Sequence, residues 1–157
     1  MLTAKIKIGD AQVVDTQTYG LVYLDSDKVT GAPSKGFEST SYPEEEGEHI
    51  IPKTTDAAFD YKAKFFIQAT SLQNANAIIT AFNNSLYTQE SGSDVKTYKQ
   101  VEFYNIYKRH KIVGYPSPIP EAESFWRDPK NVVTDVVVVE WNIRVNRPSL
   151  CDFNYSE

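Results

Sequence analysis

Two adjacent stretches decide the fold of this chain: DAAFDYKAKFFIQA at 56–69 and LQNANAIITAFNNSL at 72–86. In the first stretch, apolar side chains occupy every second position from Phe59 to Ala69, and polar side chains fill most positions between them. This period of two predicts a long β-strand with one buried face. The second stretch has apolar residues at steps of three and four, which predicts a helix with one apolar stripe. The stripe consists of Leu72, Ala75, Ile79, Phe82 and Leu86.

The remaining segments that resemble secondary structure are strands. Ser71 is suited to cap the helix, which we therefore expect at about 71–86. Strands are expected at Tyr19–Leu24, at Tyr98–Tyr107 and at Val132–Val145, whose first half is apolar on both faces and so is expected to be central or covered by the helix. Several strands, one helix and several more strands indicate an α+β protein of mainly antiparallel sheet. We expect a β-sandwich or partly closed barrel with the helix packed on it.

Composition limits the classes of function. The chain has 157 residues, which fits a single domain spanning 1–157. Its net charge of −5 argues against stable binding to nucleic acid. No signal peptide and no membrane-spanning apolar run is visible, so we expect synthesis in the cytoplasm and no membrane insertion.

Two polar stretches interrupt the pattern. Residues 26–55 contain scattered glycines and prolines and the acidic run Glu44-Glu45-Glu46, with almost no periodicity. A connection this long inside a compact domain is either a solvated loop or an arm that orders against a neighbouring subunit. Residues 88–97 indicate a shorter exposed loop.

The sequence carries no recognisable catalytic or metal-binding motif. His49 and His110 are far apart in sequence, and neither has a second histidine at a spacing suited to a metal. Cys151 has no neighbouring basic residue in sequence to activate it. Glu102 and Glu140 are the acidic residues on strands that could form a carboxylate pair. We therefore predict no enzyme activity, no cofactor and no metal.

Two surface features admit more than one interpretation. The basic cluster at 108–111, with tyrosines around it, could contact nucleic acid, form salt bridges between subunits, or mark a solvated turn. Aromatic residues at Tyr115, Phe125 and Trp126 could form an exposed platform in a monomeric carbohydrate- or protein-binding β-sandwich, although tryptophan is more often a core or interface anchor.

The order of these features resembles tail components of bacteriophages and prophages. The acidic turn Tyr42-Pro43-Glu44-Glu45-Glu46-Gly47-Glu48 is followed by Ile50-Ile51, by the strand Phe59 to Ala69, and by the helix containing Asn74-Ala75-Asn76. This succession is similar to the ring-forming N-terminal domain of distal tail proteins and to tail-tube subunits. The resemblance spans Tyr19 to Asn146, and the second domain that distal tail proteins usually carry is not expected after Glu157.

The resemblance implies a structural subunit that acts by self-assembly. It implies a ring, usually hexameric, around the channel that conducts DNA, with other tail proteins as partners and the virion tail as final location. On this basis the expected subunit interface consists of Glu44, Glu45, Glu46, His49, Lys108 and Arg109.

Overall fold

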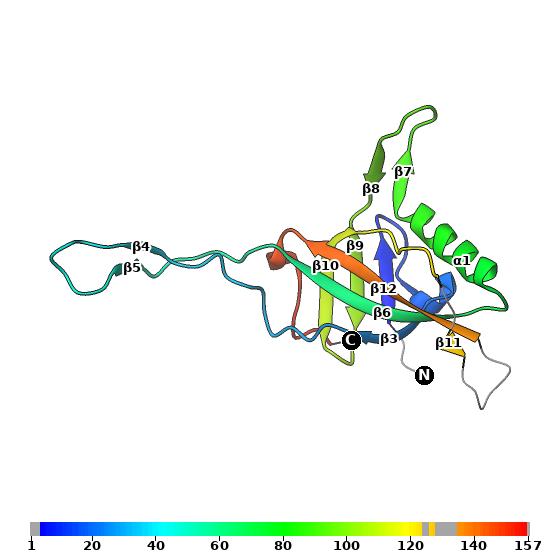
Figure 1. Ribbon diagram of the computed structural model, residues 1–157, viewed down its shortest axis with the longest axis horizontal. Coiled ribbons are helices and arrows are strands. Elements are labelled where there is room, and N and C mark those ends of the chain that lie inside the picture. The colour runs from blue at the N-terminus through cyan, green and yellow to red at the C-terminus, as the bar shows by residue number, and fades with distance from the viewer. Residues whose placement is uncertain (1–3, 124–125, 128–134, 157) are drawn as a thin grey trace.

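A computed structural model describes residues 4–123, 126–127 and 135–156. The described chain is mainly antiparallel β-sheet with one α-helix, as predicted (Figure 1). The main sheet has the strand order β2-β1-β9-β10-β12-β6-β3, and β11 pairs with β12. The main-sheet strands are β1 (Lys5–Ile8), β2 (Val14–Asp15), β3 (Val22–Ser26), β6 (Phe59–Gln68), β9 (Val101–Asn105), β10 (His110–Pro116), β11 (Trp126–Arg127) and β12 (Asp135–Val145).

The long strands β6 and β12 form the middle of the body. They pair antiparallel from Val136 opposite Gln68 to Val145 opposite Phe59. Along β6, alternate residues from Tyr61 to Ile67 are buried and most residues between them are exposed. This alternation confirms the predicted two-faced strand, whose buried face belongs to the core.

The sheet curls over its own core without closing. Phe65 on β6, Phe103 on β9 and Trp141 on β12 lie within 6.1 to 6.3 Å of one another by ring centroids, although β9 and β6 are not neighbours in the sheet. Gly114 lies where β10 meets β12, and a Cβ there would lie 2.3 Å from the carbonyl oxygen of Arg144. The tight contact between these strands therefore requires a residue without a side chain.

Helix α1 (Leu72–Ser85) packs on this core. Ser71 caps it by accepting a hydrogen bond from the Asn74 backbone amide at 3.1 Å. The predicted stripe is buried at Ala75, Ile79 and Phe82. This confirms the helix and its orientation, and no helix in the described part of the chain is long and apolar enough to cross a membrane.

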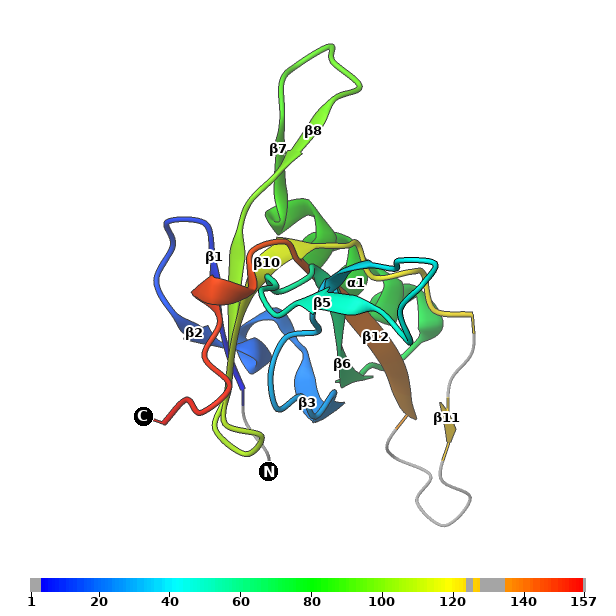
Figure 2. The same cartoon turned by 90° about the vertical axis from the view of Figure 1, so that its left-hand side faces the viewer.

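Two hairpins project from the body (Figures 1 and 2). One contains β4 (Glu38–Thr40) and β5 (His49–Ile51), within the segment predicted as an arm or loop. The other contains β7 (Tyr87–Gln89) and β8 (Lys96–Tyr98), around the predicted exposed loop. Both hairpins extend away from the body, so their outer ends lie apart from the core (Figure 1).

Two details of the prediction were wrong. Tyr19 does not begin a strand but ends a 3₁₀-helix (Thr16–Tyr19), which Asp15 caps and Gly20 closes with φ 80°. The strand expected from Tyr19 therefore begins at Val22. The expected strand Tyr98–Tyr107 is divided between β8 and β9. The first half of β12 is central, as predicted, but its outer face is open to solvent at Val138, which is 54 % exposed.

A short 3₁₀-helix (Pro148–Leu150) follows β12 and turns the chain back onto the body. After it, Asp152 exchanges two backbone hydrogen bonds with Lys111 on β10, at 2.7 and 2.9 Å. The rings of Phe153 and Phe59 lie 6.2 Å apart, so the C-terminal segment packs against the end of β6.

Candidate assembly surface

The arm, which we define as residues 34–56, consists of two antiparallel chain segments. Near its root, the Lys35 amide donates to the Thr55 carbonyl at 3.0 Å, and the hydroxyls of Ser34 and Thr54 lie 2.9 Å apart. Farther out, β4 and β5 pair over three residues each. These bonds give the arm its own backbone order although it stands away from the core (Figure 1).

Apolar side chains on the arm are exposed to solvent. Isolated exposed apolar residues are common on protein surfaces, whereas large contiguous apolar patches often mark contact sites. The exposed fractions are 58 % for Phe37, 53 % for Tyr42, 53 % for Ile50 and 47 % for Ile51. Because the arm consists of only two strands, the described part of the arm has no hydrophobic core that could cover these side chains.

The acidic turn forms the outer end of the arm. Glu44, Glu45, Glu46 and His49 are all exposed there, so the structure brings four of the predicted interface residues together. The His49 ring hydrogen-bonds to the Glu45 carboxylate and lies 5.4 Å from the Tyr42 ring, at an interplanar angle of 69°. The tip therefore combines negative charge with an exposed aromatic ring.

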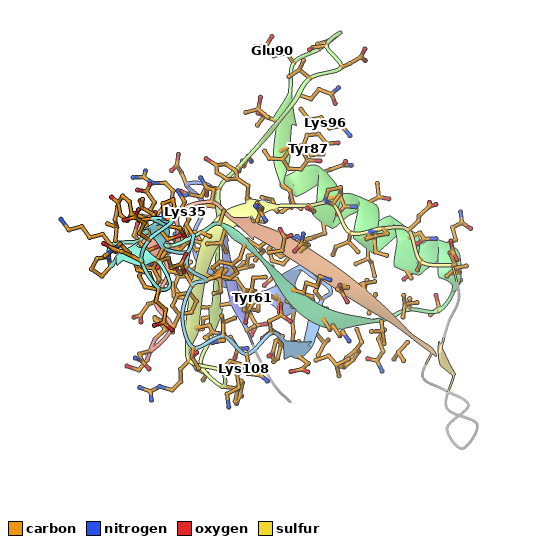
Figure 3. The ribbon with its side chains drawn as sticks, turned by 60° about the vertical axis from the view of Figure 1, so that its left-hand side comes forward. Lys35, Tyr61, Tyr87, Glu90, Lys96 and Lys108 are labelled. Atoms are coloured by element: carbon orange, nitrogen blue, oxygen red, sulfur yellow. The ribbon has the colours of Figure 1, made fainter. Side chains whose placement is uncertain are left out.

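Lys108 and Arg109 lie on the body, in the turn between β9 and β10, and not on the arm (Figure 3). Lys108 Nζ lies 3.3 Å from Asp25 Oδ1. A backbone hydrogen bond from Ser26 and the Lys108 side chain lower the pKa of Asp25. The six predicted interface residues thus form two separate groups in the chain, one at the arm tip and one on the body.

The interpretation of residues 108–111 as one basic cluster was wrong, because His110 is buried, with 1 % of its surface exposed. Its Nε2 lies 2.9 Å from the Val29 carbonyl and its Nδ1 lies 3.0 Å from the Tyr61 hydroxyl. Burial lowers the pKa of His110, so its ring is neutral at pH 7. The exposed basic side chains near this turn therefore do not include His110.

A buried polar network connects His110 to the segment that leads into the arm. The Ser26 hydroxyl lies 2.9 Å from the Tyr61 hydroxyl and 3.1 Å from Asn105 Nδ2. Burial raises the pKa of Tyr61, so its hydroxyl keeps its proton. The network holds Ser26 and Val29, which precede the arm, against the body. Sequence reasoning missed it, because these residues are distant in sequence and only Tyr61, a polar tip on an apolar face, gave a signal.

The predicted aromatic platform is only partly visible. Tyr115 lies on β10 with 42 % of its surface exposed. The backbone of Trp126, in β11, pairs with Val136 in β12. Phe125 and the side chain of Trp126 lie outside the described residues. Tyr115 is thus the one platform residue whose side chain the structure places, and it stands on the surface of the body.

The reactive side chains of the described chain have structural contacts. Cys151 Sγ lies 3.3 Å from the Val113 amide, and burial raises the pKa of its thiol. Glu102 accepts a hydrogen bond from Tyr104, whose pKa is raised to about 12 by burial and by that bond. Glu140 lies 3.7 Å from Lys62. Within residues 4–123, 126–127 and 135–156, no three His, Cys, Asp or Glu side chains cluster in a way that could hold a metal ion.

No protein-family model matches this chain, and no curated protein matches it either. The fold defines the class: a mainly antiparallel α+β protein with one helix on an open, curled sheet and two projecting hairpins. Among its surfaces, the arm carries most of the predicted interface residues.

Proposed function

We propose that this protein is a structural subunit of a phage or prophage tail, which assembles with copies of itself into a ring around a DNA-conducting channel. Its role is to self-assemble and to contact other tail proteins, and it carries out no catalytic reaction. The proposal rests on the arm together with the resemblance in the order of the acidic turn, the long strand and the helix.

The observation that carries the proposal is the set of half-exposed apolar side chains on the arm, at Phe37, Tyr42, Ile50 and Ile51. Complete burial of a large apolar side chain is worth about 1.5 to 3 kcal/mol. Since roughly half of each side chain is still exposed, contact with a neighbouring subunit would gain about 1 kcal/mol for each residue. In a closed ring every subunit gives one arm and receives another, so this gain is repeated around the ring.

Charge is compatible with the same role. The arm tip is acidic, while Lys108 and Arg109 lie on the body, so the two groups could form salt bridges only between different subunits. The net charge of −5 also suits a subunit around DNA, because a channel wall that does not bind phosphate groups lets the DNA slide.

Paired substitutions on the two hairpins test the proposal. Ile50 on the arm and Val95 on the β7–β8 hairpin are both exposed aliphatic residues, at 53 % and 70 %. We expect Ile50→Ser to raise the concentration needed for assembly roughly fivefold, the equivalent of about 1 kcal/mol, and Val95→Ser to leave it unchanged. Light scattering on each purified variant measures this. Equal assembly by both variants would show that the arm does not form the interface.

A further inference from the structure

The two ends of the arm carry opposite charges. Lys35 and Lys53 lie at its root, near the body, and the run Glu44-Glu45-Glu46 lies at its outer end, and all of these side chains are exposed. Lys35 lies seven positions before Tyr42, where the outer end begins, which is about 23 Å along an extended chain. Charges farther apart than roughly 8 Å are largely screened in physiological salt. The root and the outer end of one arm therefore do not neutralise each other.

The arm root, which we define as residues 34–38 and 53–56, contains a groove of about 390 Å³, a volume within the usual range of binding pockets. The residues that line this root groove are Lys35, Gly36, Phe37, Glu38, Lys53, Thr54 and Thr55. Phe37 supplies apolar surface, since 58 % of it is exposed. The two lysines outnumber the one carboxylate, and neither lysine forms an ion pair with a described residue. The root groove thus combines an exposed aromatic ring with a net positive charge.

Hydrogen bonds across the arm root fix the shape of this groove. The Ser34 hydroxyl accepts from the Gly36 amide at 3.0 Å, and the Thr54 hydroxyl donates to the Gly36 carbonyl at 2.8 Å. Next to the body, the Ala57 amide donates to the Pro33 carbonyl at 2.6 Å. A site that is already ordered in the free chain loses less conformational entropy when it binds. The root groove is therefore prepared to receive a partner.

The arm tip, which we define as residues 42–49, carries the complementary groups. The Glu45 amide donates to the Tyr42 carbonyl at 3.1 Å, which closes a turn. The Glu45 carboxylate is bonded to the His49 ring, whereas Glu44 and Glu46 form no ion pair with a described residue. Tyr42 is 53 % exposed. The tip therefore offers an aromatic ring and two carboxylates that are available to cations.

We propose that the arm tip of one subunit binds in the root groove of a neighbouring copy. This inference rests on the assembly proposed above and names the surface that receives the arm. Tyr42 packs beside Phe37 of the neighbouring copy, as aromatic pairs do in interfaces. Glu44 and Glu46 pair with the two root lysines of that copy through charge-assisted hydrogen bonds. Because each subunit has one tip and one root groove, the contact is head-to-tail and can be repeated around a closed ring.

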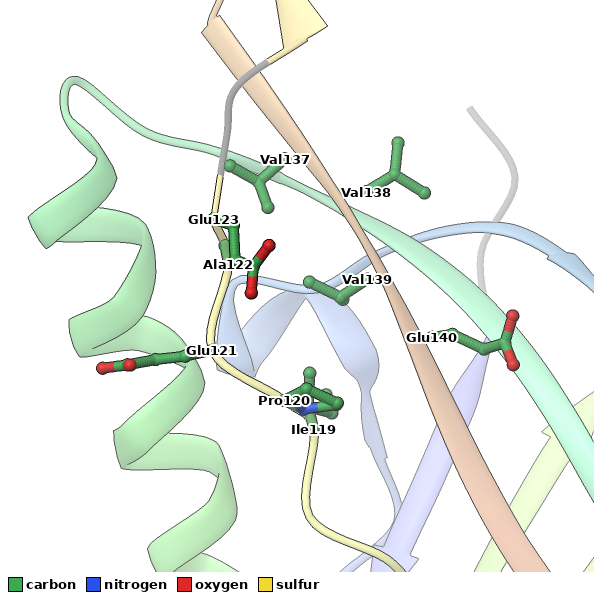
Figure 4. A pocket seen from close by; sticks show the side chains of 9 residues that line it. All are labelled: Ile119, Pro120, Glu121, Ala122, Glu123, Val137, Val138, Val139 and Glu140. Atoms are coloured by element: carbon green, nitrogen blue, oxygen red, sulfur yellow. The ribbon is translucent and has the colours of Figure 1, made fainter.

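Two other surfaces fit the acidic tip less well. A groove between segment 119–123 and β12 has no lysine or arginine among its lining residues, and Glu121 and Glu140 point away from it (Figure 4). On the body, Lys108 already lies 3.3 Å from the Asp25 carboxylate. Of these three surfaces, the arm root alone combines an exposed aromatic ring with two lysines that have no ion-pair partner in the described chain.

Charge reversal at each end of the arm tests this pairing. The root variant carries Lys35→Glu and Lys53→Glu, and the tip variant carries Glu44→Lys and Glu46→Lys. We expect each variant alone to need a roughly tenfold or higher concentration to assemble, because two attractions become repulsions. Light scattering over a concentration series measures this. The four side chains are exposed, so the Tm of the monomer should stay unchanged in both variants.

An equimolar mixture of the two variants tests whether the contact joins different chains. In the mixture, the basic tip of the tip variant can meet the acidic root of the root variant, and the remaining tip and root keep their original charges. We therefore expect the mixture to assemble at about the same concentration as the unsubstituted chain. A mixture that assembles no better than either variant alone would overturn the inference.

Two matched double reversals complete the test. Lys96→Glu with Lys99→Glu makes the same change of charge in and beside β8 and should leave assembly unchanged. Lys108→Glu with Arg109→Glu examines the body as the rival surface. If this variant impairs assembly and the root variant does not, the tip binds the body, so the inference is wrong while the proposed function stands. An unsubstituted chain that remains monomeric at every concentration would overturn the proposed function and the inference together.

Discussion

Replacing Phe82 with alanine should test whether helix α1 is part of the core. Phe82 is 1 % exposed, and its ring lies edge-on to Trp141 at a centroid distance of 5.3 Å and to Tyr19 at 5.4 Å. Removing a buried phenylalanine costs about 3 to 5 kcal/mol, and favourable aromatic pairs place this site toward the middle or upper part of that range. We therefore expect Phe82→Ala to lower the free energy of unfolding by about 4 kcal/mol.

The matched control is Phe37→Ala, the same substitution at a ring that is 58 % exposed on the arm. It should change the free energy of unfolding of the monomer by no more than about 0.5 kcal/mol. Thermal unfolding followed by circular dichroism measures both variants, and for a domain of this size about 4 kcal/mol corresponds to roughly 8 to 16 °C in Tm. Equal small shifts would refute the packing of the helix on the sheet.

Two further predictions concern the crossing of β10 with β12 and the buried histidine. Gly114→Ala should destabilise the fold by about 1 to 3 kcal/mol in urea unfolding, because its Cβ would overlap the Arg144 carbonyl, whereas Gly31→Ala, with open space around it, should be tolerated. Burial lowers the pKa of His110 below the value of 6.5 that the unfolded chain has, so the unfolded state binds the proton more readily. The contribution of His110 to the free energy of unfolding should therefore be complete above about pH 6.5, and the free energy of unfolding should fall as the pH drops below that value. His110→Gln should remove this fall while His49→Gln keeps it, and an unchanged pH profile in His110→Gln would contradict the assignment.

The regular parts of the fold could be predicted because their periodicity is local. The alternation in β6 and the apolar stripe of α1 each depend on residues close together in sequence. The apolar residues of the β6 alternation and the stripe residues Ala75, Ile79 and Phe82 are buried as expected. The residue at which a short strand begins depends on single capping residues. Asp15 and Gly20 convert the expected start of a strand into a 3₁₀ turn, which an alternating pattern does not reveal.

The features that depend on tertiary structure could not be read from the sequence. His110 directly follows Lys108 and Arg109 in sequence, which predicts a shared basic surface, but the turn directs its ring into the core toward Tyr61. Asn76 and Asn83 bind the backbone of the distant residues Ala122 and Ile119 to the helix, but in the sequence these asparagines indicate only polar positions of a helix. Contacts between distant segments decided both outcomes.

The most direct measurement of the central claim is sedimentation velocity on the purified 157-residue chain over a series of increasing concentrations. Self-assembly through the arm predicts a monomer at low concentration and one discrete, larger species at high concentration, which deletion of residues 37–51 abolishes. Glu45→Ala, at the arm tip, should shift the position of this equilibrium without changing the Tm of the monomer. A single monomeric species at every concentration, or assembly that survives removal of the arm, would contradict the account.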